Sequence, residues 1–205
     1  MKSLLSLLFS LFVVATPALA QEVQGPDTLI KHVTEDVLTV VRQDKEIQNG
    51  NTQKAIALVE AKVLPHFNFQ HMTALAMGRD WNKATPEQKK RLSDEFNTLL
   101  VRTYSNSLSS YKNQTVVYKP TKLSGTETDV IVKTEILQPG NKPVQLDYAL
   151  EKLAGGWKVY DVIVAGISLV TNYRDTFTQE VRASGIDGLI LMLTNKNKQL
   201  EAGKK

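Results

Sequence analysis

The chain has 205 residues, with 25 lysines and arginines, 21 aspartates and glutamates, and a formal net charge of +4. It contains no cysteine, so disulfides, thiol chemistry and a lipid anchor on an N-terminal cysteine are not expected. The basic residues are mixed with acidic ones along the chain, whereas nucleic-acid binders usually gather theirs into a stripe or block, so no nucleic-acid partner is expected either.

The first twenty residues have the pattern of a secretory signal peptide. A short basic start precedes an apolar run over residues 4–14, and Ala-Leu-Ala at residues 18–20 is a small-x-small cleavage pattern. The apolar run is too short to cross a membrane as a helix. We therefore predict a signal peptide over residues 1–20, a single domain over residues 21–205, and export to the periplasm of a Gram-negative cell.

Helical periodicity dominates the next part of the chain. Apolar residues recur at helical spacing over residues 26–48 and 52–64, and a further short apolar helix is expected to end near Gly78. Thr-Pro-Glu-Gln at residues 85–88 forms a capping box with proline at the first helical position. A long helix should begin there, and its apolar stripe continues as far as Tyr111.

The apolar period then changes from helical spacing to two, which predicts strands. They are expected over residues 115–119, 128–137, 144–153 and 157–164, with turn sequences between them. The strands follow one another closely, which is typical of an antiparallel meander. In the last strand the inward-facing parity changes between Val159 and Val162, which indicates a β-bulge near Asp161.

The chain closes with two predicted helices separated by Gly185. The first carries an apolar stripe from Ile167 to Val181, and the second runs from Ile186 to Leu200. The predicted fold class is therefore α+β, a curved antiparallel sheet covered by helices. A curved sheet with helices over its concave side makes a cone, and a cone encloses a pocket.

Polar residues that could perform catalysis or bind metal are few. His66 and His71 lie five residues apart, which is not the spacing of a helical zinc pair, so no metal site is expected. Adjacent aspartate and tyrosine residues in a strand, as at 147–148 and 160–161, point to opposite faces. Asp161, beside the predicted bulge, is the one carboxylate with a possible catalytic role, but no catalytic site and no cofactor are predicted.

Apolar side chains on converging elements are the candidate binding residues instead. Periodicity alone favours their packing together as an ordinary core, because apolar stripes usually are core. The candidates are Phe69, Met72, Leu75, Leu99, Tyr104, Val130, Val132, Ile136, Leu146, Tyr148, Leu150, Val164, Ile167, Val170 and Tyr173.

Residues 161–174, DVIVAGISLVTNYR, followed by GIDGL at residues 185–189, resemble the MlaC family, also called the toluene-tolerance family. Four further segments agree in the same order along the chain: LPHF at 64–67, ATPEQ at 84–88, LDY at 146–148 and WKVYD at 157–161. The chain departs from the pattern at Ala165, where some members carry an acidic residue.

This resemblance implies a periplasmic phospholipid carrier whose bound lipid is cargo rather than a cofactor. It implies a nuclear-transport-factor-2-like (NTF2-like) cone that encloses acyl tails and leaves the headgroup exposed, so the apolar candidates become tail-pocket residues. The implied partners are an outer-membrane lipoprotein–porin complex and an inner-membrane ABC transporter with an MCE-domain subunit, which together maintain outer-membrane lipid asymmetry. Two alternatives are a small-molecule enzyme on a similar cone and a packed interaction module without ligand.

Overall fold

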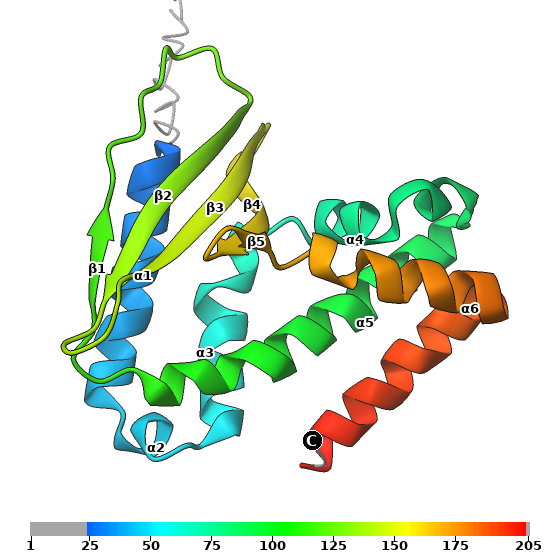
Figure 1. Cartoon of the computed structure of the whole chain (residues 1–205), viewed down its shortest axis with the longest axis horizontal. Helices are drawn as coiled ribbons and strands as arrows, with labels where there is room; N and C mark the ends of the chain where they lie inside the picture. Colours follow the sequence, from blue (N-terminus) through cyan, green and yellow to red (C-terminus); the bar gives the residue numbers. More distant parts are fainter. Residues whose placement is uncertain (1–23, 204–205) are drawn as a thin grey trace, which may run out of the picture.

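The computed structural model describes residues 24–203 (Figure 1). The predicted signal peptide over residues 1–20 lies outside the described residues. Between the ends, the chain forms the α+β architecture that its patterns predict. The helices are α1 (Pro26–Gln43), α2 (Lys45–Gln48), α3 (Thr52–Lys62), α4 (Phe69–Met77), α5 (Pro86–Tyr104) and α6 (Arg174–Glu201), with short 3₁₀ helices over Leu64–His66, Gly78–Lys83, Ser105–Ser110 and Thr171–Tyr173.

Five antiparallel strands form one sheet in chain order, as the predicted meander requires. They are β1 (Thr115–Tyr118), β2 (Asp129–Leu137), β3 (Val144–Leu153), β4 (Gly156–Val164) and β5 (Ile167–Ser168). Ala149 pairs with Asp161 and Leu150 pairs with Val159, so Tyr160 is the extra residue of a bulge. The bulge predicted near Asp161 is therefore confirmed, and it lets Val159 and Val162 pack in the same cluster.

The predicted helix over residues 26–48 is in fact two helices that meet at Asp44. This residue has extended backbone angles (φ −91°, ψ 101°), and its carboxylate accepts the N–H groups of Glu46 and Ile47. An aspartate in this position caps a new helix start, which breaks the first helix without a glycine or proline. The apolar stripe continues across the break, so the periodicity alone does not reveal it.

The prediction of a helix beginning at Ile167 is wrong. Ile167 and Ser168 pair back onto β4 as strand β5, through a two-residue turn at Ala165 and Gly166, whose φ angles of 50° and 83° are both positive. Such a turn reverses the chain tightly, and α6 begins only at Arg174.

The break predicted at Gly185 is present as a kink within α6, where Gly185 has a φ of 75°. The stripe expected to reach Tyr111 leaves α5 at Tyr104 and continues as a 3₁₀ helix.

The apolar residues gather in separate places. Figure 1 shows α1 lying across one face of the sheet, and α4, α5 and α6 forming a helical region beside it. The helical region has its own core, in which Phe96, Phe177 and Leu189 are almost completely buried. A second cluster joins α1 to the sheet. The third joins α1 to α3 and the 3₁₀ helix that follows α5. This arrangement positions the site described next.

Candidate functional site

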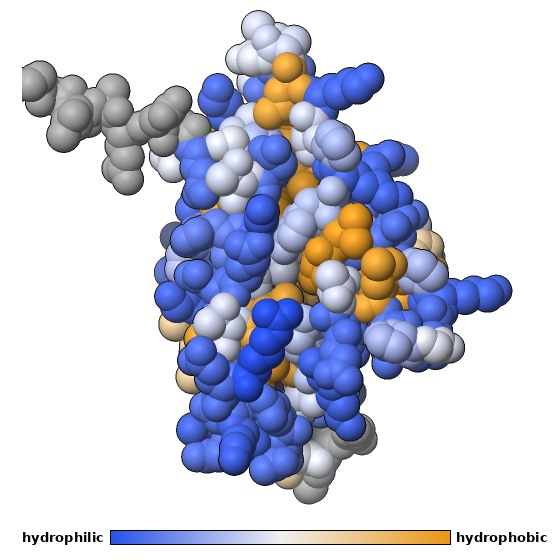
Figure 2. Space-filling view, turned by 90° about the vertical axis from the view of Figure 1, so that its left-hand side faces the viewer, coloured by the Kyte–Doolittle hydropathy of each residue, from blue (hydrophilic) through white to orange (hydrophobic). Residues whose placement is uncertain are grey.

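An apolar cavity of about 330 Å³ lies between α1 and the sheet. The end of α3 and the 3₁₀ helix after α5 close it from the other sides. Its lining residues are Leu29, Ile30, Val33, Thr34, Val37, Leu38, Val63, His66, Phe67, Ser107, Leu108, Tyr111, Val116, Ile136, Leu146, Tyr148 and Val159. In Figure 2, which faces the side of the molecule that carries β1 and α1, apolar side chains come to the surface between hydrophilic flanks.

Helix α1 and the alternating strand residues provide most of this lining. The six lining residues of α1 lie between Leu29 and Leu38 at helical spacing, so they form one stripe toward the sheet. Ile136 of β2, together with Leu146 and Tyr148 of β3, faces this stripe from the sheet. The even-numbered residues of both strands share that face because side chains alternate along a strand.

Part of the cavity wall lies outside the packed clusters. Within residues 24–203, Leu38, Val116, Ile136 and Leu146 line the cavity and belong to none of the three packed apolar clusters. Protein interiors are ordinarily filled at close to crystal density, so an apolar surface left without neighbours lowers stability unless something covers it. The apolar stripes therefore make a core in some places and a cavity wall in this one.

The cavity carries no charge at neutral pH. In the part of the chain that the structure describes, no aspartate, glutamate, lysine or arginine lines it. Burial, and secondarily the nearby Lys158, lower the pKa of His66, which keeps its imidazole neutral. Burial raises the pKa of Tyr148, so its phenol stays protonated. An uncharged and largely apolar wall suits a hydrocarbon chain.

The predicted site residues fall into four sets. Ile136, Leu146 and Tyr148 line the cavity. Val130, Val132 and Leu150 are buried in the packed cluster beneath α1. Phe69, Met72, Leu75, Leu99, Val170 and Tyr173 belong to, or pack against, the core of the helical region. Tyr104, Val164 and Ile167 are exposed, with 42%, 39% and 65% of their surface accessible. Lipid contact stays a prediction for all of them.

The sequence analysis missed the contribution of α1. Its apolar stripe is visible in the sequence, but nothing in a single helical pattern says which element it will face. Leu108 and Tyr111 also line the cavity, although the apolar stripe in the sequence predicts them at the end of one long helix. The signal that could have found them is the spacing of Leu108 and Tyr111, which also fits the tighter 3₁₀ turn.

Asp161, the one carboxylate singled out in the sequence, has structural partners. It is 7% exposed, and its oxygens accept the N–H groups of Val162 and Val170 and the hydroxyl of Ser168. These hydrogen bonds stabilise the β4–β5 turn, so the carboxylate of Asp161 has a structural role. Nowhere in residues 24–203 do three or more histidine, aspartate or glutamate side chains lie together in a way that could hold a metal ion.

Comparison with known proteins places the chain in a family. A family model described as MlaC protein matches residues 31–195. The chain belongs to the MlaC family. The chain is 30% identical to the toluene tolerance protein ttg2D of Pseudomonas putida, over 84% of its own length and 80% of that protein. It is 24% identical to the intermembrane phospholipid transport system binding protein MlaC of Haemophilus influenzae, over 96% and 92% of the two chains.

A solved structure is similar to this chain over most of its length. The phospholipid-binding protein from Ralstonia solanacearum, determined in complex with a phospholipid, superposes with a TM-score of 0.80 at 38% identity, covering 87% of this chain and 99% of that one. The fold class and family expected from the sequence are thus confirmed. None of the helices formed by residues 24–203 has both the length and the apolar character needed to cross a bilayer.

Proposed function

We propose that this protein is a phospholipid carrier, not an enzyme, that holds acyl chains in the cavity beneath α1 and moves lipid between membranes. The observation that carries the proposal is the uncharged apolar cavity between α1 and the sheet. The similar Ralstonia solanacearum protein was solved with a phospholipid, and the relative from Haemophilus influenzae is a binding protein of intermembrane phospholipid transport. Both support the assignment.

The energetics of acyl chains explain why such a protein needs a cavity. Two tails with about 30 methylenes would cost roughly 24 kcal/mol to leave in water, at about 0.8 kcal/mol each. A carrier in water must therefore cover nearly all of that surface. The bilayer interior is equally apolar, so transfer between bilayer and cavity is close to balanced. Partners at each membrane are needed to lower the barrier to extraction and release.

The cavity volume limits what the observed conformation can hold. Benzene, with six carbons, occupies an engineered cavity of about 150 Å³, which corresponds to roughly 25 Å³ per carbon. At that density, the cavity of about 330 Å³ has room for about 13 carbons, close to one acyl chain. A second tail would need a wider separation of α1 from the sheet than this conformation has.

The finer assignments follow the family expectation. We infer that the protein is exported to the periplasm after removal of residues 1–20. We also infer that it exchanges lipid with an outer-membrane lipoprotein–porin complex and with an inner-membrane ABC transporter carrying an MCE-domain subunit. Such a route would maintain the lipid asymmetry of the outer membrane. Because the free energy of moving a lipid from the bilayer into the cavity is close to zero, the carrier depends on partners of this kind.

Two isoleucines on opposite faces of β2 provide the test. Ile136 lines the cavity, whereas Ile131 is 48% exposed on the other face. Ile136→Glu places a carboxylate among acyl carbons, which is strongly unfavourable. We expect the phospholipid that an organic solvent extracts per protein molecule, measured by mass spectrometry, to fall about tenfold or more, which is at least 1.4 kcal/mol of affinity.

Ile131→Glu is the matched control and should keep the wild-type lipid content. Circular dichroism melting of both variants shows whether each is folded. The proposal fails if the wild-type protein yields no phospholipid, or if a folded Ile136→Glu variant carries as much as the wild type.

A further inference from the structure

A polar pocket of about 420 Å³ adjoins the apolar cavity at Tyr111, which lines both. Its lining residues are Arg42, Gln48, Asn49, Ser109, Tyr111, Lys112 and Asn113. They come from the ends of α1 and α2, the residue that follows α2, the 3₁₀ helix after α5 and the segment that leads from it to β1. A hydrocarbon-binding cavity and a polar pocket thus meet at one side chain.

Tyr111 is fixed at this boundary by its hydroxyl group. The hydroxyl donates a hydrogen bond to the backbone oxygen of Gln114 and accepts one from Arg42 Nη2 at 2.7 Å. Because the hydroxyl is engaged in both directions, the ring cannot turn freely, and the guanidinium of Arg42 is held beside it. The other N–H groups of this guanidinium form a planar fork suited to an oxyanion.

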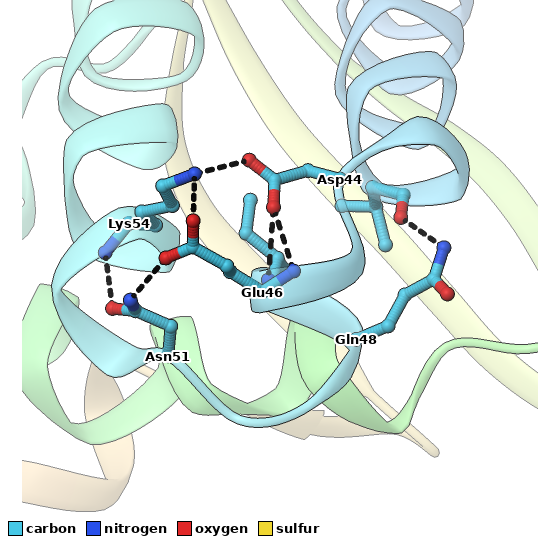
Figure 3. Close-up of polar contacts among 7 residues, drawn as sticks. Asp44, Glu46, Gln48, Asn51 and Lys54 are labelled. Carbon is cyan, nitrogen blue, oxygen red and sulfur yellow. Dashed lines mark hydrogen bonds and ion pairs between the residues drawn. The ribbon is translucent and has the colours of Figure 1, made fainter.

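The positive charge of the pocket is not neutralised by the carboxylates closest in sequence. Figure 3 shows Asp44 and Glu46 pointing toward Lys54, whose Nζ lies 3.1 Å from Asp44 Oδ2 and 2.9 Å from Glu46 Oε1. The bond with Lys54 lowers the pKa of Asp44, so this carboxylate stays ionised and committed to its own partners.

Arg42 and Lys112 therefore face the pocket as two uncompensated cations. Neither has an ion-pair partner among residues 24–203, and no carboxylate belongs to the lining. Gln48 points back to α1 (Figure 3). Its amide donates to the carbonyl oxygens of Val41 and Arg42. The hydroxyl oxygen of Ser109 has no hydrogen-bond partner in the described structure. The pocket is thus rich in donors and lacks an acceptor of matching charge.

We propose that this pocket binds the phosphate group of the lipid whose acyl chain occupies the cavity, with Arg42 and Lys112 as the cationic partners. The inference rests on the proposed lipid-carrier function and adds a site for the polar end of the cargo. A phosphodiester carries one negative charge and two free oxygens, which match a guanidinium fork and an ammonium group.

The exposure of both cations determines which part of the lipid the site recognises. Arg42 and Lys112 are exposed, so the group attached beyond the phosphate extends into water. The site therefore recognises the phosphate that all phospholipids share, and it does not distinguish one headgroup from another. Diacylglycerol, which has the same tails and no phosphate, would fill the cavity and leave the pocket empty.

A competition between these two lipids tests the inference. The purified, delipidated protein is exposed to detergent micelles that contain equal amounts of dipalmitoyl phosphatidylglycerol and dipalmitoyl glycerol, and the bound lipids are quantified by mass spectrometry. In the Arg42→Gln/Lys112→Gln variant we expect the bound phospholipid-to-diacylglycerol ratio to fall about tenfold, with total bound lipid little changed. Lys45→Gln, which removes an exposed lysine outside the pocket, should keep the wild-type ratio.

Each outcome bears on one claim. If the wild-type protein takes up neither lipid, the carrier function itself fails. If it takes up both and the double variant keeps the wild-type ratio, or Lys45→Gln lowers the ratio as much, the phosphate site is wrong while the carrier function stands.

Calorimetric titration with inorganic phosphate distinguishes a site for the phosphate of a bound lipid from a site for a free anion. Binding of inorganic phosphate that persists unchanged in the wild-type protein loaded with phospholipid would mark a separate free-anion site and overturn the inference.

Discussion

The helical region and the sheet with α1 are built from similar apolar stripes, but the first has a packed core and the second encloses a cavity. In the helical region, Phe96 packs edge-on against Phe177 and Tyr173, each with ring centres 5.1 Å apart. Between α1 and the sheet, Leu38 and Leu146 line a cavity instead. An apolar stripe therefore predicts only which side chains leave water. Whether those side chains pack against others or line a cavity depends on the elements that lie opposite the stripe.

The largest expected effect is the loss of an aromatic side chain from the helical core. Phe96 is fully buried, so Phe96→Ala should lower the free energy of unfolding by about 3–5 kcal/mol. Leu146→Ala in the cavity wall should cost only about 1 kcal/mol, because fewer neighbours lose contact. Chemical denaturation of the delipidated proteins measures both. Equal losses would mean that the two regions are packed alike.

Adding side-chain volume, rather than removing it, should also distinguish the two regions. Ala76 is completely buried in the helical core, and Ala76→Leu should lower the free energy of unfolding by about 1–3 kcal/mol. Leu38→Phe adds volume to the cavity, where room exists, and should change stability by less than about 1 kcal/mol. The same variant should carry less lipid by mass spectrometry. A strongly destabilised Leu38→Phe would contradict an open cavity.

The hairpin between β4 and β5 joins the two regions and contains a strained residue. Ala165 has a φ of 50°, which costs a residue with a Cβ about 1–2 kcal/mol, whereas asparagine tolerates this conformation. Ala165→Asn should therefore raise the free energy of unfolding by about 0.5–1 kcal/mol in thermal or chemical denaturation, with lipid content unchanged. Unchanged or lower stability would show that the turn is not strained.

The smallest effect should come from the pH dependence of the cavity wall. The folded-state pKa of His66 is lowered by burial, so the folded protein binds fewer protons there than the unfolded chain. Its contribution to stability is complete above the unfolded pKa, near 6.5, and declines as pH falls below that value. Melting curves between pH 7.5 and 5.5 should show a weaker pH dependence in His66→Gln than in the wild type. Parallel curves would contradict this assignment.

Local chemistry predicts most of the elements, and tertiary contacts decide the site. The capping box at residues 85–88 and the alternation of β3 set element boundaries because each acts within a few residues. Val132 and Ile136 share one face of β2 and look equivalent in sequence. The first is sealed beneath α1, and the second faces a cavity. The position of α1 over the sheet separates them, and no pattern within β2 reveals it.

Helix α5 runs from the helical region toward α2 (Figure 1), and the 3₁₀ helix that follows it contributes to the cavity lining. It starts at the capped Pro86, packs with α4 and α6, and passes at Tyr104 into the 3₁₀ helix that carries Leu108. Its 19 residues make a rod about 28 Å long. A tilt of about 5° at one end displaces the other by roughly 2.5 Å. A partner that tilted α5 at its helical end would therefore shift the cavity lining at Leu108 without touching it.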